Sequence, residues 1–246
     1  MKRSLKDLIG YTIETKDGKK GKVKDFLFDE KQWIVRYLEA DFGNLFSSEK
    51  VLIPKVFFKQ PLWKDKVFPA ELLTSEIERC PKVDDHLPVS RKYEEVLYKH
   101  YQLNPYWTAA YMGSMGGYFP PRPINVPSQT ISEDEVDTTL RSFKEVEGYQ
   151  IHALNDTIGH VEDIVIDDED WQITYAVIDT KNWLPWSKKV LIAIDWMDNI
   201  SYSKREVKIG LRTESIKNAP EFSHSDFIDI KYEKSLYDYY SKSLTK

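Results

Sequence analysis

The chain contains one sequence unit twice. Residues 10–41 match residues 148–179 without a gap at an offset of 148 − 10 = 138, and ten of the 32 positions are identical. In the first copy these identities are Gly10, Tyr11, Ile13, Gly21, Val23, Asp25, Asp29, Trp33, Tyr37 and Asp41. A repeat of this length predicts that the 246 residues form two similar domains rather than one large domain.

Each copy has the pattern of several short β-strands separated by turn residues. Along 171–179, apolar and less apolar residues alternate with the period of two that is typical of a strand with one buried face. Gly21 and Gly159 each begin a predicted strand, where glycine indicates a bulge or a close approach of another backbone. The predicted strands cover residues 11–15, 21–28, 33–41, 50–54 and 64–68 in the first copy and 149–153, 159–166, 171–179, 189–193 and 206–209 in the second. Strands this short and this closely spaced predict a small β-barrel in each half.

The two copies also share a tail. Residues 93–101 match residues 232–240 at an offset of 139, and Tyr93, Leu97, Tyr98 and Tyr101 fall on one face of a helix. We therefore expect a short helix after each barrel, with its aromatic face docked on a barrel or on the other copy. The predicted organisation is a first domain over 1–101, a linker rich in glycine, proline and aromatic residues over 102–140, and a second domain over 141–246. We expect part of this linker to pack on a barrel, and the two barrels to pack on each other as a pseudo-dimer.

Two patterns together resemble a known family. They are G-x-x-I…G-x-V-x-D-x-x-x-D…W-x-x-x-Y…D followed by V-L-I-P, and the tail Y-E-x-x-L-Y-x-H-Y…P-Y-W over 93–107. They resemble the PRC-barrel family, whose members include the cytoplasmic domain of the photosynthetic reaction-centre H subunit and a domain of a ribosome-maturation factor. The resemblance implies a mainly β fold with a six-stranded barrel in each half, and a role in assembly or docking. The second copy departs from the pattern, since Ala193 replaces Pro54 and no P-Y-W follows Tyr240.

Composition narrows the classes of partner. A net charge of −5 argues against a general phosphate-binding surface, so direct nucleic-acid binding is not expected. The single cysteine, Cys80, cannot form an internal disulfide, and no base near it in the sequence would activate it. The N-terminus lacks the apolar stretch of a signal peptide, and no run of about 20 apolar residues predicts a transmembrane segment. These features favour a soluble protein of the cytoplasm.

The recurring acids are the first candidates for chemistry. Asp25 and Asp29 are four residues apart on a predicted strand, which places them roughly 13 Å apart and too far to share a proton. We expect Asp29 and Asp167 to accept hydrogen bonds from turn backbone. We expect Asp25 and Asp163 to meet a backbone amide or a lysine.

The histidines are the second candidates. His152 and His160 flank a predicted hairpin and could approach each other across two strands, but Glu14 and Lys22 occupy the matching positions of the first copy. We therefore expect no metal site there. Since no catalytic or phosphate-binding motif is present either, we expect no catalytic residues, no cofactor and no enzymatic activity.

Large aromatic side chains that differ between the copies are candidates for an interface. The predicted interface residues are the unmatched tryptophans Trp63, Trp107, Trp183, Trp186 and Trp196, together with Tyr239 and Tyr240, which we expect to lie uncovered because no matching segment follows them. The main hypothesis is an adaptor that binds a protein partner, with a homodimer through the tyrosine-rich tails as a further possibility. Two alternatives are a ribosome- or RNA-associated maturation factor, and a small-ligand sensor or enzyme with a site between the barrels.

Overall fold

Two β-sheets make up most of the molecule. The computed structural model describes residues 1–44, 46–82, 89–107, 139–180, 188–223 and 228–244. The first sheet has the order β5-β4-β3-β2-β6, and its strands are β2 (Thr12–Glu14), β3 (Lys20–Asp29), β4 (Ile34–Asp41), β5 (Lys50–Pro54) and β6 (Val67–Pro69). The second has the order β11-β10-β9-β8-β13-β12, with β8 (Gln150–His152), β9 (Thr157–Asp167), β10 (Ile173–Asp179), β11 (Lys189–Ala193), β12 (Met197–Ser201) and β13 (Glu206–Ile209). The mainly β fold is confirmed, and a strand lies within or overlaps each predicted range, although β6 begins only at Val67 and β12 was not predicted.

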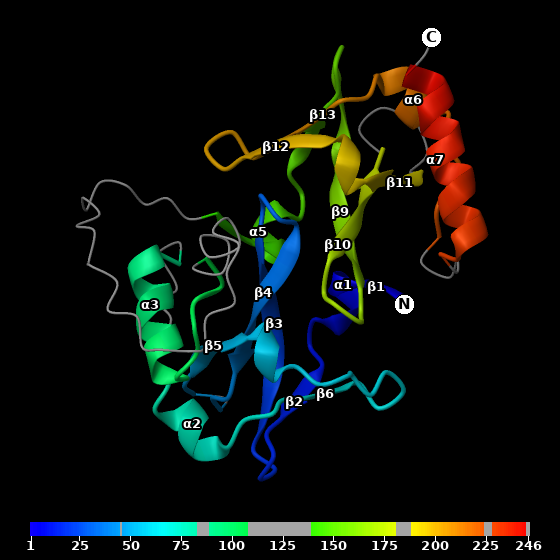
Figure 1. Ribbon diagram of the computed structural model, residues 1–246. Helices are drawn as coiled ribbons and strands as arrows, with labels where there is room; N and C mark the ends of the chain where they lie inside the picture. The colour runs from blue at the N-terminus through cyan, green and yellow to red at the C-terminus, as the bar shows by residue number, and fades with distance from the viewer. Residues whose placement is uncertain (45, 83–88, 108–138, 181–187, 224–227, 245–246) are drawn as a thin grey trace, which may run out of the picture.

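Helices flank the two sheets. The two tail helices are α3 (Arg91–His100) and α7 (Ile230–Leu244), and they lie on opposite sides of the molecule (Figure 1). Both were predicted from the spacing of their apolar residues. The shorter helical segments are η1 (Lys55–Phe57), α2 (Thr74–Glu78), η2 (Ile194–Trp196) and α6 (Thr213–Lys217), none of which was predicted. They are too short to show a helical period in the sequence.

The two halves exchange their first strands, which the sequence did not predict. The N-terminal strand β1 (Lys2–Ser4) pairs with β9 of the second sheet (Figure 1). In return β7 (Leu140–Ser142), which begins the second copy, pairs with β3 of the first sheet. The exchange makes the two halves one body and confirms the expected pseudo-dimer. It also corrects the linker boundary, since Leu140 belongs to β7.

The recurring acids Asp25 and Asp163 stabilise the exchanged strands through hydrogen bonds. Ser4 precedes the one-turn helix α1 (Leu5–Leu8), and its hydroxyl accepts from the Asp7 amide and donates to the Asp163 carboxylate. The Lys6 amide donates to the same carboxylate at 3.1 Å. Asp163 itself is fully buried. The side chain therefore joins the first unit's leading turn to the second unit's sheet.

The second half of the exchange repeats this arrangement. Ser142 caps α5 (Phe143–Val146) and donates to Asp25, and the Lys144 amide donates to Asp25 at 3.1 Å. Each acid also accepts from the next amide of its own strand, Asp25 from Phe26 at 2.8 Å and Asp163 from Ile164 at 2.7 Å. The expected amide contacts are confirmed, and the strand exchange explains why the two acids recur.

The turn acids follow their expected role too. Asp29 accepts hydrogen bonds from the amides of Lys31 at 2.9 Å and Gln32 at 3.1 Å. Asp167 accepts from the Glu169 amide at 3.1 Å. These bonds close the turns that lead into β4 and β10.

The two shared tryptophans, Trp33 and Trp171, also cross between the halves. Both have positive φ, 52° and 65°, at the tip of a hairpin. The Val35 amide donates to the Trp171 carbonyl at 3.0 Å, and the Ile173 amide donates to the Trp33 carbonyl at 2.7 Å. Trp171 thereby enters the core of the first sheet, where it packs on Phe26, Phe58 and Phe68 at centroid distances of 6.0, 4.9 and 5.4 Å.

The reciprocal site around Trp33 is packed less completely. Met197 and Val207 stand where the first half has Phe58 and Phe68, and a small cavity remains beside the Trp33 ring. Its lining is entirely apolar and comes from Trp33, Val146, Val161, Ile164, Ala176, Ile194, Met197, Ile200 and Val207. Met197 and Val207 are smaller than the two phenylalanines of the first half, so we interpret this cavity as a packing gap between the two halves.

Gly159 permits the close approach of β9 and β10. Its φ is +65°, and a Cβ placed there would lie 2.0 Å from the Asp179 carbonyl oxygen. A Cβ at Gly21 would lie 2.7 Å from the Asp41 carbonyl oxygen. The predicted close backbone approach is confirmed at both positions.

The exchange makes stability depend on pH through Asp25. Burial raises the pKa of Asp25 from 3.8 to about 6, because lost hydration outweighs its three hydrogen bonds. An acid whose pKa is raised by folding stabilises the fold fully below about pH 4, and this contribution is lost as the pH rises through about 6. Between pH 5 and pH 7.5 the free energy of unfolding should therefore fall by about 1 kcal/mol on account of Asp25.

The Asp25→Asn variant tests this dependence. Asparagine does not titrate, so the fall in unfolding free energy between the two pH values should be smaller by about 1 kcal/mol. Urea unfolding of both proteins at pH 5 and pH 7.5 measures the difference. An equal fall in the wild type and the variant would show that Asp25 does not titrate in this range.

Candidate functional site

One face of helix α3 is covered by the residues that follow it. We call Arg91, Glu94 and Tyr98 the α3 stripe, since they lie three and four residues apart on one face. Tyr106 and Trp107 cover this stripe, with ring centroids 6.1 and 5.2 Å from the Tyr98 ring. Glu94 is 1% exposed and Tyr98 is 9% exposed as a result.

The cover consists of alternating aromatic and guanidinium groups around one buried acid. The Arg36 guanidinium lies 3.8 Å from the centre of the Tyr106 ring, and the Arg91 guanidinium lies 4.2 Å from the centre of the Trp107 ring. Glu94 pairs with Arg91 at 2.8 Å and accepts from the Tyr106 hydroxyl at 3.1 Å.

Glu94 also accepts a hydrogen bond from strand β4 of the first sheet, where the buried Tyr37 hydroxyl donates to it at 2.7 Å. Burial raises the pKa of Glu94, while the Tyr37 hydroxyl and the Arg91 guanidinium oppose the rise. A buried acid therefore links the tail helix, its aromatic cover and the barrel.

The matching face of helix α7 is open to solvent. The residues Ile230, Glu233 and Tyr237, which we call the α7 stripe, occupy the positions of Arg91, Glu94 and Tyr98. Ile230 is 83% exposed, Tyr237 is 38% exposed and the Glu233 side chain is 30% exposed. The three positions are therefore more exposed on α7 than on α3, and the largest exposed side chains are Ile230 and Tyr237.

The two faces differ because the two helices end differently. Helix α3 ends at His100, and Gln102 adopts a positive φ of 54° that reverses the chain. The Leu103 amide then donates to the Tyr98 carbonyl at 2.9 Å, and the returning chain brings Tyr106 onto the helix. Helix α7 instead continues to Leu244.

Two acids, Glu233 of the α7 stripe and the neighbouring Asp195, accept hydrogen bonds from tyrosines at this surface. The Tyr237 hydroxyl donates to Asp195 at 2.9 Å, and the buried Tyr175 hydroxyl donates to Glu233 at 2.9 Å. Lys2 from the exchanged strand approaches Glu233 at 3.8 Å. The two arginines that surround the α3 stripe, Arg36 and Arg91, are replaced here by Thr174 and Ile230.

The structure separates the predicted interface residues into several environments. Trp196 is half-buried and packs on Tyr237 and Tyr240 at 5.2 and 4.7 Å, so it borders the α7 stripe. Tyr239 is half-buried and donates to the Ser215 carbonyl at 2.7 Å. Tyr240 is fully buried and donates to the Leu191 carbonyl. The expectation that Tyr240 lies uncovered is wrong, because α7 places its side chain against β11 of the second sheet.

The remaining predicted tryptophans lie elsewhere. Trp63 is half-buried against Tyr11, with the Arg3 guanidinium 4.4 Å from its ring centre. Trp107 belongs to the cover of the α3 stripe, which confirms that part of the linker packs on the first unit. Trp183 and Trp186 lie outside the described residues. Ile230, Glu233 and Tyr237 were not among the predicted interface residues, and only a position-by-position comparison of the two tail helices could have indicated them.

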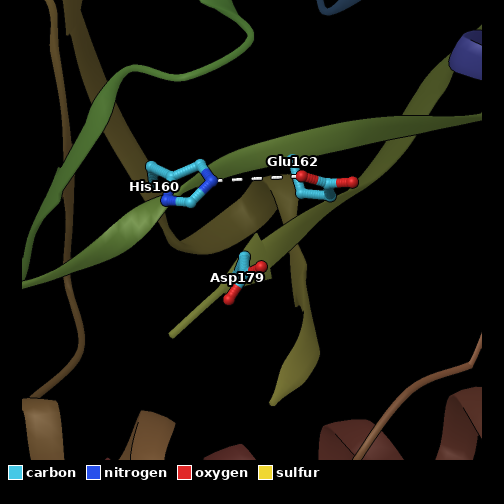
Figure 2. Close-up of side chains that lie close together, drawn as sticks. All are labelled: His160, Glu162 and Asp179. Carbon is cyan, nitrogen blue, oxygen red and sulfur yellow. Dashed lines mark ion pairs between the residues drawn. The ribbon is translucent and has the colours of Figure 1, made fainter. Parts of the chain in front are cut away.

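A second cluster has the residue types of a metal site. His160 and Glu162 are two apart on β9 and Asp179 faces them from β10, with one ligand atom of each lying within 4.8 Å of the others (Figure 2). The Glu162 carboxylate already pairs with Lys6 and Lys189, both at 3.0 Å. Although burial opposes them, these ammonium groups hold the pKa of Glu162 below its usual value. A cation would have to displace them, so we interpret the cluster as an ion-pair network that holds α1 on β9.

The other candidates for chemistry have structural explanations. His152 lies 3.1 Å from Glu206, so the two histidines of the predicted hairpin have different acidic neighbours. Cys80 is buried, and burial raises the pKa of its thiol to about 11. A thiol with this pKa stays protonated at neutral pH and is a poor nucleophile.

Comparison with known proteins identifies the repeated unit. The family model of the PRC-barrel domain matches residues 2–67 and 139–214, which together make up more than half of the chain. Both segments include an exchanged strand and the strands that follow it. A search of curated proteins found no match. Within the described residues, no helix is long and apolar enough to cross a membrane.

Proposed function

The chain belongs to the PRC-barrel domain family with one matched segment in each half, and from this premise we propose that it is a non-enzymatic protein-binding adaptor or assembly module. The observation that carries the proposal is the exposure of the α7 stripe. Its counterpart on α3 is covered by Tyr106 and Trp107, whereas Ile230 and Tyr237 remain 83% and 38% exposed. An apolar and aromatic surface bordered by polar groups is typical of a protein-binding site.

The acids that recur in both copies have structural roles, which supports the proposal that the protein is not an enzyme. Asp25 and Asp163 are engaged in the strand exchange, and Asp29 closes a turn. The described cavity between the halves is small and lined only by apolar side chains. The three acids therefore have structural roles in the fold. A reaction site would instead need polar groups that converge on a larger cavity.

Site-specific cross-linking tests the adaptor proposal. We would replace Ile230 with the photo-cross-linking residue benzoylphenylalanine and irradiate the protein in lysate of its source organism. Tyr202 is the matched control position, because it is 53% exposed in the turn between β12 and β13. We expect cross-linked protein bands at position 230 that are absent at position 202 and are lost when Tyr237→Ala is added. Identical bands from the two positions would contradict the proposal.

A further inference from the structure

The α7 stripe retains the acid of the α3 stripe without the groups that complete it. Glu94 has Tyr37 beneath it, Tyr106 above it and Arg91 beside it. Glu233 has Tyr175 beneath it and forms a long ion pair of 3.8 Å with the ammonium group of Lys2, which also pairs with Asp167 at 3.2 Å. The positions that would supply two guanidinium groups are Thr174 and Ile230 instead.

We propose that the α7 stripe binds a segment of a partner protein that carries a tyrosine or tryptophan next to an arginine. This inference rests on the proposed adaptor function and specifies the chemistry of its partner. The aromatic ring would pack on Tyr237 as Tyr106 and Trp107 pack on Tyr98. The guanidinium would pair with Glu233 as Arg91 pairs with Glu94.

Charge complementarity favours this occupant over a purely apolar segment. Asp195 and Glu233 both lie at the stripe, and Asp195 is exposed. An arginine can pair with a carboxylate and also stack on an aromatic ring, and both kinds of contact hold Tyr106 and Trp107 on α3. A lysine would supply the charge but not the planar group that stacks.

The probe is a synthetic peptide built from the chain's own cover. It has the sequence of residues 102–107 followed by one arginine. The control peptide has citrulline, the neutral analogue of arginine, in place of that residue. Both are fluorescently labelled, and their dissociation constants for the full chain are measured by anisotropy. We expect the arginine peptide to bind roughly fivefold more tightly, as an exposed ion pair of about 1 kcal/mol predicts.

Three variants locate the binding. Tyr237→Ala should weaken the arginine peptide about tenfold or more, because it removes the ring on which the peptide stacks. Tyr202→Ala is the matched control and should leave binding unchanged. Ile230→Arg introduces at α7 the residue that α3 has, so it should pair with Glu233 and reduce the preference for arginine over citrulline to about one. Ile230 is 83% exposed, so this variant is expected to fold.

The outcomes separate this inference from the adaptor proposal. Equal affinity of the two peptides for the wild type, or equal weakening by Tyr237→Ala and Tyr202→Ala, would overturn the inference, while cross-linking at position 230 would still support an adaptor. Peptide binding as expected without cross-linking at position 230 would show that the stripe can bind such a peptide but has no protein partner in the lysate, and would therefore count against both the adaptor and the inference that rests on it. Self-association in sedimentation velocity that Tyr237→Ala abolishes would identify a second copy as the occupant and overturn the inference.

Discussion

Replacing Trp171 with alanine is expected to lower the free energy of unfolding by about 3–5 kcal/mol. The side chain is 6% exposed and packs among Phe26, Phe58 and Phe68, so its removal leaves a large cavity. Because this ring comes from the second half and fills the core of the first, the loss should weaken both halves together. Urea unfolding followed by far-ultraviolet circular dichroism measures the change.

Trp33→Ala is the matched comparison for Trp171→Ala. Trp33 occupies the equivalent position but is half-buried and borders a cavity, so it loses fewer packing contacts. We expect a smaller loss, about 1–3 kcal/mol. If Trp33→Ala cost as much as Trp171→Ala or more, the described difference in packing would not govern stability.

Replacing Asp163 with alanine is expected to cost about 3 kcal/mol. The change leaves the amides of Lys6 and Ile164 and the hydroxyl of Ser4 without their acceptor in a buried region. The relief from removing a buried carboxylate offsets part of this cost. The strand β1 should detach first, since Ser4 ends it.

Two measurements check the Asp163→Ala prediction. Urea unfolding gives the loss of stability, and hydrogen exchange should show faster exchange at the Lys6 amide than in the wild type. The control is Asp198→Ala, because Asp198 is an exposed acid on β12 whose removal should change stability by less than about 0.5 kcal/mol. Unchanged exchange at Lys6 in the Asp163 variant would contradict a role for this acid in holding the exchanged strand.

Much of the local structure could be predicted from the sequence. The alternation along 171–179 indicates β10, and the spacing of Tyr93, Leu97 and Tyr101 indicates α3. Ser4 followed three residues later by Asp7 indicates the capped turn of α1. These features depend on neighbouring residues, whose spacing is visible in the sequence.

The candidate surface could be predicted only in part. Trp196 was expected at an interface and does border the α7 stripe, whereas Tyr240 was expected there and is buried. The exposure of a helical face depends on where the following chain runs. The positive φ of Gln102 reverses the chain after α3, and no sequence pattern marked that residue as a turn.

The duplication, most of the strands and the two tail helices could be predicted from repeats and residue spacing in the sequence. Only the tertiary structure decided that β1 and β7 exchange sheets, that Trp33 and Trp171 cross between the halves, and that the α3 stripe is covered while the α7 stripe is open. The physical reason is that the two copies have nearly the same local pattern. A three-residue strand or a tryptophan at a hairpin tip can satisfy its contacts in its own unit or in the other one. Which of the two contacts forms depends on how the units pack in the folded chain, and a local sequence pattern does not contain that information.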